Sequence, residues 1–298
     1  MKLGLIGLGK MGINLALNLA EQDFTVSGYD IDKEVTTKNY HPNIHCTNHL
    51  KTFSSQLSQR KIIWLMVPAG EITKQMIEQI TPELQPGDII IDGGNSNYQQ
   101  TIETGKQLSS KGIHFFDCGT SGGVSGARNG ACLMIGGEEE VFHEIEPIIK
   151  ALALPNGYLY TGEVGSGHFL KMVHNGIEYG MMQAIAEGFE VLHKSPFNYD
   201  YAAVAKVFNN GSVIESWLME LMENIFKEDE QLENIRGIMH STGEGKWTVE
   251  TALNFQVPTP VIALSLMMRY RSLEEDTFSG KVIAALRNQF GGHEVVKK

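Results

Sequence analysis

Residues 2–12 read KLGLIGLGKMG, and this stretch decides the fold of the N-terminal half. Lys2 to Ile6 form a short apolar strand, and the apolar spacing from Met11 to Ala20 predicts a helix. A Gly-x-Gly-x-x-Gly run between a strand and a helix is typical of dinucleotide binding, because glycine permits a tight turn and a close approach of phosphate to the backbone. The candidate cofactor ligands in this turn are Gly7, Leu8, Gly9, Lys10, Met11 and Gly12.

A carboxylate at the end of the second strand indicates which dinucleotide binds. The strand from Phe24 to Tyr29 ends at Asp30, where such folds place a residue that accepts hydrogen bonds from the ribose hydroxyls. Asp30 would repel the 2′-phosphate of NADP, and Lys33 is the nearest cation that follows it. The sequence therefore predicts NAD as the cofactor.

Strands and helices continue to alternate as far as residue 152. This alternation predicts a mostly parallel sheet that is covered by helices on both faces. Ligands of such sheets bind at the carboxyl ends of the strands. The further strands are expected at 61–67, 88–92, 114–118 and 131–135, and the further helices at 71–80, 97–111 and 138–152.

Several side chains follow the expected strand ends and are therefore site candidates. Val67 and Pro68 are expected beside the cofactor, and Asn95 beside both the cofactor and the substrate. The glycine-rich run at 119–126 is expected to form a loop whose successive N–H groups bind a carboxylate or phosphate, with an ordinary tight turn as the alternative. Its candidate residues are Ser121, Gly122 and Gly123.

A second informative stretch, GSGHFLKMVHNGIEYGMMQAIAEGFE, occupies residues 165–190. It predicts one long helix with Ser166 as a candidate N-cap. Polar residues at spacings of three and four share one stripe of such a helix, amid apolar neighbours such as Met172 and Met181. We expect a buried wall whose polar stripe faces a cleft, although ordinary surface charges are the alternative. The stripe contains Lys171, His174, Asn175, Glu178 and Tyr179.

The 298 residues predict two domains. Strand signals fade after residue 154, apart from a short strand at 158–160, and the remainder has helical spacing. We expect a Rossmann-type α/β dinucleotide-binding domain over residues 1–163 and an all-α substrate and oligomerisation domain over residues 164–298. In the second domain, a loop at 241–248 and the pair Arg269 and Arg271 are candidates for binding an anionic substrate, with surface charge as the alternative.

The composition excludes several classes of protein. The chain has 24 basic and 35 acidic residues, a formal charge of -11, which argues against binding to nucleic acid or to an anionic membrane. No signal peptide or membrane span is recognisable, and three cysteines are too few for a disulfide framework, so we expect a cytoplasmic protein. His41, His45 and His49 have helical spacing, but Pro42 interrupts a helix there, so we expect surface-loop residues and no metal.

The motifs together resemble those of the 6-phosphogluconate dehydrogenases, over nearly the whole chain. GLIGLGKMG opens the pattern of the wider β-hydroxyacid dehydrogenase superfamily. The resemblance implies NAD-dependent oxidative decarboxylation of 6-phosphogluconate, a sugar-acid phosphate of the pentose phosphate pathway, to ribulose 5-phosphate and carbon dioxide. The chain looks like a short form of the family, and we expect a homodimer or homotetramer that encloses the substrate. The other motifs that carry the resemblance are IDGGNSNY, TSGGVSGARNG, GSGHFLKMVHNGIEYG and GKWT.

The resemblance also implies a role for each polar residue. Lys171 would take the proton of the C3 hydroxyl while hydride leaves for the cofactor, and Glu178 would protonate C1 after carbon dioxide has left. Tyr179 and Arg269 would face the substrate phosphate. The substrate hydroxyls and carboxylate would be held by Asn95, Ser121, Gly122, Gly123, His174 and Asn175.

One segment departs from the family pattern. The long-form members carry a lysine and a threonine beside the glycine that precedes GKWT, where this chain has Thr242 and Glu244. One alternative function is a 3-hydroxyisobutyrate-type dehydrogenase, which would share Lys171 but would not need His174 and Glu178. The other alternative is a nicotinamide-binding sensor without turnover, which would not need Lys171 together with Glu178.

Overall fold

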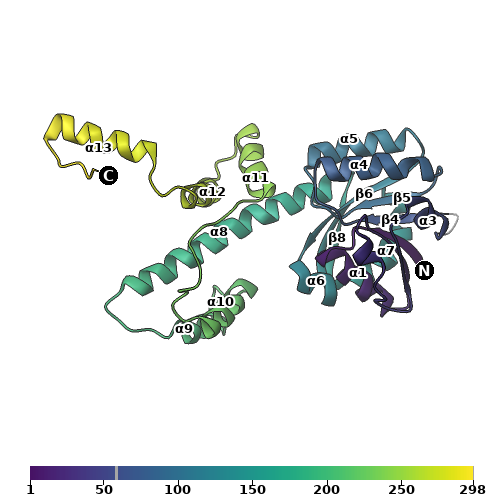
Figure 1. Ribbon diagram of the computed structural model, residues 1–298, viewed down its shortest axis with the longest axis horizontal. Coiled ribbons are helices and arrows are strands. Elements are labelled where there is room, and N and C mark those ends of the chain that lie inside the picture. The colour runs from purple at the N-terminus through teal and green to yellow at the C-terminus, as the bar shows by residue number, and fades with distance from the viewer. Residues whose placement is uncertain (58–59, 298) are drawn as a thin grey trace. The chain divides into compact units, whose positions relative to one another are not determined.

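A computed structural model describes residues 1–57 and 60–297 of the chain (Figure 1). The chain divides into two units, residues 1–174 and residues 175–298. The first contains the sheet and the second, over its described residues, consists of helices and connecting segments, which confirms the predicted fold class. The domain boundary after residue 163 stays a prediction. One helix, α8 (Ser166–Lys194), begins in the first unit and ends in the second.

Over the described residues of the first unit, eight strands form a single sheet. They are β1 (Lys2–Ile6), β2 (Thr25–Tyr29), β3 (Ile44–Thr47), β4 (Ile62–Leu65), β5 (Ile89–Asp92), β6 (His114–Ser121), β7 (Ala131–Gly136) and β8 (Ala153–Gly162). Their order is β3-β2-β1-β4-β5-β6-β7-β8, and the paired neighbours are parallel except β6 and β7. The chain order reverses between β1 and β4, so the loops after these two strands open the crevice in which such sheets bind ligands.

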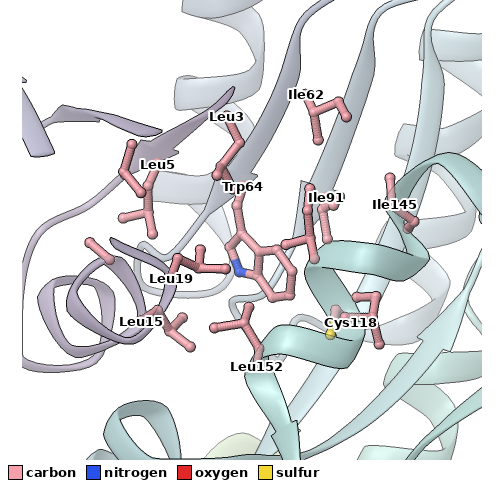
Figure 2. Packing of buried hydrophobic residues seen from close by; sticks show 14 of the residues in the cluster. Leu3, Leu5, Leu15, Leu19, Ile62, Trp64, Ile91, Cys118, Ile145 and Leu152 are labelled. Carbon is pink, nitrogen blue, oxygen red and sulfur yellow. The ribbon is translucent and has the colours of Figure 1, made fainter. Parts of the chain in front are cut away.

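Helices cover both faces of this sheet. They are α1 (Lys10–Ala20), α2 (Lys33–Thr36), α3 (Leu50–Ser55), α4 (Glu71–Ile80), the 3-10 turn η1 (Thr81–Glu83), α5 (Tyr98–Ser109), α6 (Gly123–Asn129) and α7 (Glu139–Leu152). Figure 2 shows the fully buried Trp64 of β4 among Leu19 of α1 and Ile91 of β5. Successive strand side chains alternate between faces, so the neighbouring Ile63 joins Phe53 of α3 in a second cluster. The apolar strands are thus buried on both sides, as parallel sheets require.

The second unit has a smaller apolar core. Besides the end of α8, its helices are α9 (Tyr201–Phe208), α10 (Trp217–Glu228), α11 (Gly243–Asn254), α12 (Pro260–Ser272) and α13 (Phe278–Gly291). Phe189, Ala205, Met219 and Phe226 are buried together, and the rings of Phe189 and Phe226 stack with centroids 5.3 Å apart. By contrast, α12 and α13 expose Val261, Leu264, Met267, Phe278, Ile283, Leu286 and Phe290. Among the described helices, none is long and apolar enough to span a membrane.

The short elements are where the structure differs from the sequence prediction. Helices α2, α3 and α6 and strand β3 were not expected, because four to seven residues are too few to show a periodic apolar pattern. His45 lies on β3, in register with Ser27 of β2, and His49 is the N-cap of α3. The prediction that these histidines lie in a surface loop was therefore wrong for His45, whereas His41 and His49 lie in connecting segments.

Two other boundaries also differ. Helix α11 begins at Gly243, so the segment predicted as a loop at 241–248 is mostly helical. Strand β8 extends over Ala153–Gly162, rather than only 158–160, because it pairs with β7 and follows α7 directly. Polar residues such as Asn156 hid the beginning of this strand in the sequence.

The three cysteine thiols are free and differ in exposure. Cys118 of β6 is buried, Cys46 of β3 is half-buried and Cys132 of β7 is exposed. Burial raises the pKa of Cys46 to about 11, and it raises the pKa of Cys118 far above its usual range. The thiols of Cys46 and Cys118 therefore stay protonated at neutral pH.

Candidate active site

The turn after β1 has the backbone that the glycine pattern predicts. Gly7 has a φ of +93°, a conformation that residues with side chains rarely adopt. A methyl group added to Gly12 would overlap the carbonyl oxygen of Gly7, so α1 packs directly against the end of β1. Gly9 is the N-cap of α1, and the space beside its Cα is open. The first N–H groups of α1 are therefore accessible to a pyrophosphate.

Asp30 connects the end of β2 to this turn. One of its carboxylate oxygens accepts a hydrogen bond from the N–H of Leu8 at 2.7 Å, and the other accepts one from the N–H of Asp32 at 3.0 Å. The half-buried carboxylate thus stands beside the glycine turn, where a ribose-binding residue is expected. Sequence reasoning identified Asp30 but missed its bond to Leu8, because the two residues are 22 positions apart.

The segment after β4 lies against the same turn. A methyl group added to Gly7 would contact the backbone of Met66 and the side chain of Val67. The hydroxyl of Thr73 donates a hydrogen bond to the carbonyl oxygen of Pro68 at 2.9 Å, which fixes the entry into α4. Val67 and Pro68 therefore border the crevice between β1 and β4.

Asn95 is held in the loop after β5 and is engaged with β6. Its φ is +52°, and the loop is braced by Asp92, which accepts hydrogen bonds from the N–H of Gly94 at 2.9 Å and from the hydroxyl of Ser96 at 2.7 Å. The Asn95 side-chain oxygen accepts from the N–H of Thr120 at 2.9 Å, and its amide nitrogen donates to the Thr120 carbonyl at 3.2 Å. The side chain thereby aligns β5 with the end of β6.

The glycine-rich run at 119–126 is not the single loop that the sequence suggested. Ser121 is the last residue of β6, and helix α6 begins at Gly123. The chain turns from the strand into the helix at Gly122, the N-cap of α6, and Gly123, which have φ values of +114° and +58°. The strand extends this far because Ser121 pairs with Cys132 of β7.

Lys171 lies in the second turn of α8 and exposes 5% of its surface. Its Nζ is 3.5 Å from Nδ1 of His174, and Nε2 of His174 is 3.3 Å from the hydroxyl of Ser121. A methyl group added to Gly119 would overlap the Cβ of Lys171, so this glycine of β6 lets the lysine stem lie against the strand. The structure thus joins an amine, an imidazole and a hydroxyl in one chain of contacts, which is suited to moving a proton.

In the second unit, Tyr179 of α8 is the centre of a separate cluster. Its side chain is buried, and its hydroxyl accepts a hydrogen bond from the N–H of Thr242 at 2.9 Å. The guanidinium of Arg269 lies over the tyrosine ring, with Cζ 3.7 Å from the ring centroid, and donates to the carbonyl of His240 at 3.0 Å. Thr242, where the sequence departs from the family pattern, is therefore the direct partner of Tyr179.

The remaining site residues on α8 are Asn175 and Glu178, both half-buried in the second unit. The neighbouring Ile177 and Met181 are exposed by 53% and 42%. The prediction that the apolar part of this helix is a buried wall was therefore wrong at these two positions. The candidate residues form two groups, one in each unit, which share α8 as a common element.

Comparisons with known proteins agree along the whole chain. The family model described as the NAD binding domain of 6-phosphogluconate dehydrogenase matches residues 2–162, and the model of the C-terminal domain of 6-phosphogluconate dehydrogenase matches residues 167–294. The chain is 56% identical to Bacillus subtilis YqeC over the full length of both proteins. It is 38% identical to the NAD(+)-dependent, decarboxylating 6-phosphogluconate dehydrogenase of Haloferax volcanii, covering 100% of this chain and 99% of that one.

A solved structure shows the same similarity in three dimensions. The 6-phosphogluconate dehydrogenase of Plasmodium falciparum, studied with NADP+ and with 6-phosphogluconate, superposes with a TM-score of 0.84 at 30% identity. The match covers 100% of this chain and 66% of that longer one. Both domain models and the full-length relatives agree, so the chain belongs to the 6-phosphogluconate dehydrogenase family.

Proposed function

We propose that this protein catalyses the NAD-dependent oxidative decarboxylation of 6-phosphogluconate to ribulose 5-phosphate and carbon dioxide, a step of the pentose phosphate pathway. The observation that carries the proposal is the buried Lys171, whose amine contacts His174, which in turn contacts the hydroxyl of Ser121. Burying a lysine has a cost in free energy, and a role in proton transfer to and from a substrate hydroxyl would explain why the residue is buried. The full-length similarity to the Haloferax volcanii enzyme supports the same reaction.

The residues of the first unit fit NAD. The open space at Gly9 admits a pyrophosphate, the start of α1 offers N–H donors, and the Asp30 carboxylate offers an acceptor for ribose hydroxyls. The loop residues Lys10 and Met11, together with Val67 and Pro68, would line the cofactor. Bound NAD supplies an acceptor for the hydride that leaves C3.

The protein groups supply the proton transfers. Lys171 takes the proton of the C3 hydroxyl as the hydride departs, a role that requires its amine to be uncharged beforehand. The resulting β-keto acid loses carbon dioxide readily, and the protonated Lys171 then polarises the C3 carbonyl as the enol forms. Glu178, two turns further along α8, donates the proton to C1 of the enol. His174 and Ser121 keep the lysine amine in place through this cycle.

The rest of the substrate requires hydrogen bonds and positive charge. We place the substrate hydroxyls and carboxylate against Asn95, Asn175 and the turn formed by Gly122 and Gly123. The phosphate would meet Arg269 and Tyr179, whose stacking supports this assignment because it holds the guanidinium in a fixed direction. Thr242 donates its backbone N–H to Tyr179 and would act through that residue.

We further propose that the protein is a cytoplasmic homodimer or homotetramer. The apolar side chains that α12 and α13 expose support self-association, because exposed apolar area of this kind marks interfaces. The three free thiols support a reducing compartment.

The decisive experiment measures absorbance of reduced nicotinamide and release of carbon dioxide together. The purified protein is given 6-phosphogluconate or 3-hydroxyisobutyrate, each with NAD or NADP. The proposal predicts equal amounts of reduced NAD and carbon dioxide with 6-phosphogluconate only. Oxidation of 3-hydroxyisobutyrate without carbon dioxide would favour the sister activity, and absence of turnover with either substrate would favour a nicotinamide-binding sensor.

A further inference from the structure

The first turn of α8 is capped by a residue from the sheet. Asp117 of β6 is fully buried, and its carboxylate accepts hydrogen bonds from the N–H of Gly165 at 2.6 Å and from the N–H of His168 at 2.7 Å. Burial raises the pKa of Asp117, while His168 and the two N–H donors oppose that rise. The predicted cap, Ser166, is instead the first helical residue and pairs with the hydroxyl of Thr161. The start of the helix is thus fixed to β6.

The imidazole of His168 makes a second connection from the same turn. The side chain is 1% exposed; its Nδ1 lies 2.8 Å from the hydroxyl of Thr101 on α5, and its Nε2 lies 3.2 Å from the carbonyl oxygen of Asp92 at the end of β5. A carbonyl oxygen can only accept, so Nε2 carries a proton and donates it in this bond. His168 therefore links α8 to both β5 and α5.

These contacts lie close to the backbone that carries Lys171. His168 precedes Lys171 by one helical turn, and Asp117 precedes Gly119, the glycine against which the lysine stem lies, by two strand residues. Asp92 takes part in both the Asn95 loop and this anchor: its side chain accepts a hydrogen bond in the loop, and its backbone carbonyl accepts the bond from His168. The helix therefore has hydrogen-bonded anchors to β6, β5 and α5 in the turn before Lys171, which fix the rotation of the helix about its own axis.

We propose that Asp117 and His168 are positioning residues, which hold the first turn of α8 against β5 and β6 and thereby aim the Lys171 amine at the substrate hydroxyl. Neither residue touches the amine directly in these contacts; both act through the helix backbone. The inference rests on the proposed role of Lys171. Proton transfer requires the donor and acceptor to be within hydrogen-bond reach, so a small rotation of α8 should reduce turnover more than it weakens binding.

The test compares two substitutions of His168. His168→Gln keeps an N–H that can reach the Asp92 carbonyl, whereas His168→Phe keeps the ring volume and loses both polar contacts. We expect His168→Phe to lower kcat at least tenfold while KM for 6-phosphogluconate and Kd for NAD change less than threefold. His168→Gln should recover most of the lost kcat. Thermal unfolding and circular dichroism verify that both variants are folded.

A matched buried carboxylate provides the control for Asp117→Asn. Asp88, before the start of β5, is also buried and accepts hydrogen bonds from the N–H groups of Lys61 and Gln85, each at 2.8 Å. It lies at the opposite ends of the strands from the loops of the site. Asp117→Asn and Asp88→Asn should both lower the thermal midpoint, but only Asp117→Asn should lower kcat at a temperature where both are folded.

The outcomes separate this inference from the proposed function. If Lys171→Met abolishes turnover while His168→Phe and Asp117→Asn retain the kcat of the unmodified protein, the positioning role is wrong and the proposed function stands. A kcat for His168→Gln no higher than that for His168→Phe would also overturn the positioning role. An unmodified protein that does not oxidise 6-phosphogluconate would refute the proposed function and this inference with it. If Asp117→Asn fails to fold, the His168 pair still decides.

Discussion

Replacing Asp30 with asparagine should move the cofactor preference from NAD toward NADP. The carboxylate stands at the end of β2 beside the glycine turn, where the ribose of a dinucleotide is expected. The substitution preserves size and one oxygen, so the hydrogen bond from the N–H of Leu8 can be retained. It removes the charge and one of the two acceptors, the one that accepts from the N–H of Asp32, so the variant tests electrostatics while the bond to the glycine turn is kept.

The magnitude follows from the charge that NADP would bring. A unit charge 4 Å from the carboxylate costs about 1 kcal/mol in bulk water and about 4 kcal/mol at the effective dielectric of a protein surface. The phosphate carries a charge of about −1.5 to −2, so even the aqueous figure gives roughly 1.5 kcal/mol. Since about 1.4 kcal/mol corresponds to a factor of ten, the unmodified protein should prefer NAD at least tenfold in kcat/KM.

The assay is the ratio of kcat/KM for NAD to that for NADP, with 6-phosphogluconate held at saturation. Asp30→Asn should lower this ratio at least tenfold, because NAD loses an acceptor for its ribose while NADP loses a repulsion. Asp32→Asn is the matched control, because it removes the same charge only two residues from Asp30. The carboxylate of Asp32 accepts a hydrogen bond from the N–H of Glu34 and not from the glycine turn. A native preference for NADP, or an equal effect of both substitutions, would refute the role of Asp30.

The remaining predictions concern the chemistry and the assembly. Lys171→Met should bind NAD normally but lower turnover by several orders of magnitude, as measured by cofactor titration and steady-state kinetics; near-normal turnover would end its assignment as the base. Glu178→Gln should lower kcat by about 10²–10⁴-fold because an amide cannot protonate C1, and an unchanged rate would contradict the general-acid role. Gly119→Ala should lower kcat while NAD affinity is unchanged, because the added methyl group overlaps the lysine stem; stopped-flow hydride transfer at normal speed would count against this. Sedimentation should show at least a dimer, and an active monomer at assay concentration would exclude the proposed assembly.

The fold of the first unit was largely predictable from local patterns. The strand at Lys2–Ile6 and the helix at Glu71–Ile80 match the structure at both ends, because each has a strong apolar pattern between clear breaks. Strand β3 was missed because most of its order comes from backbone pairing with β2, which a four-residue sequence does not reveal. Propensity predicts long elements well and short edge elements poorly.

The sequence identified candidate residues of the site but not the hydrogen bonds that hold them. The sequence indicated Lys171, Tyr179 and Asn95 because each lies in a distinctive motif. It did not indicate Asp117 or His168, because their hydrogen-bond partners lie in other strands and helices, and a buried Asp or His has no periodic signature. Long-range hydrogen bonds are decided by tertiary packing, so they become visible only when the sheet has been assembled.

The unequal exposure of the three thiols makes the protein suitable for site-specific labelling. A maleimide dye reacts with thiolates, and burial keeps Cys46 and Cys118 protonated and shielded, so the dye should attach at the exposed Cys132. Cys132 of β7 is paired in register with Ser121 of β6, and the hydroxyl of Ser121 contacts His174. A fluorophore placed there would report the arrival of a ligand at the end of β6 as a change in emission, without any cysteine being engineered into or out of the natural chain.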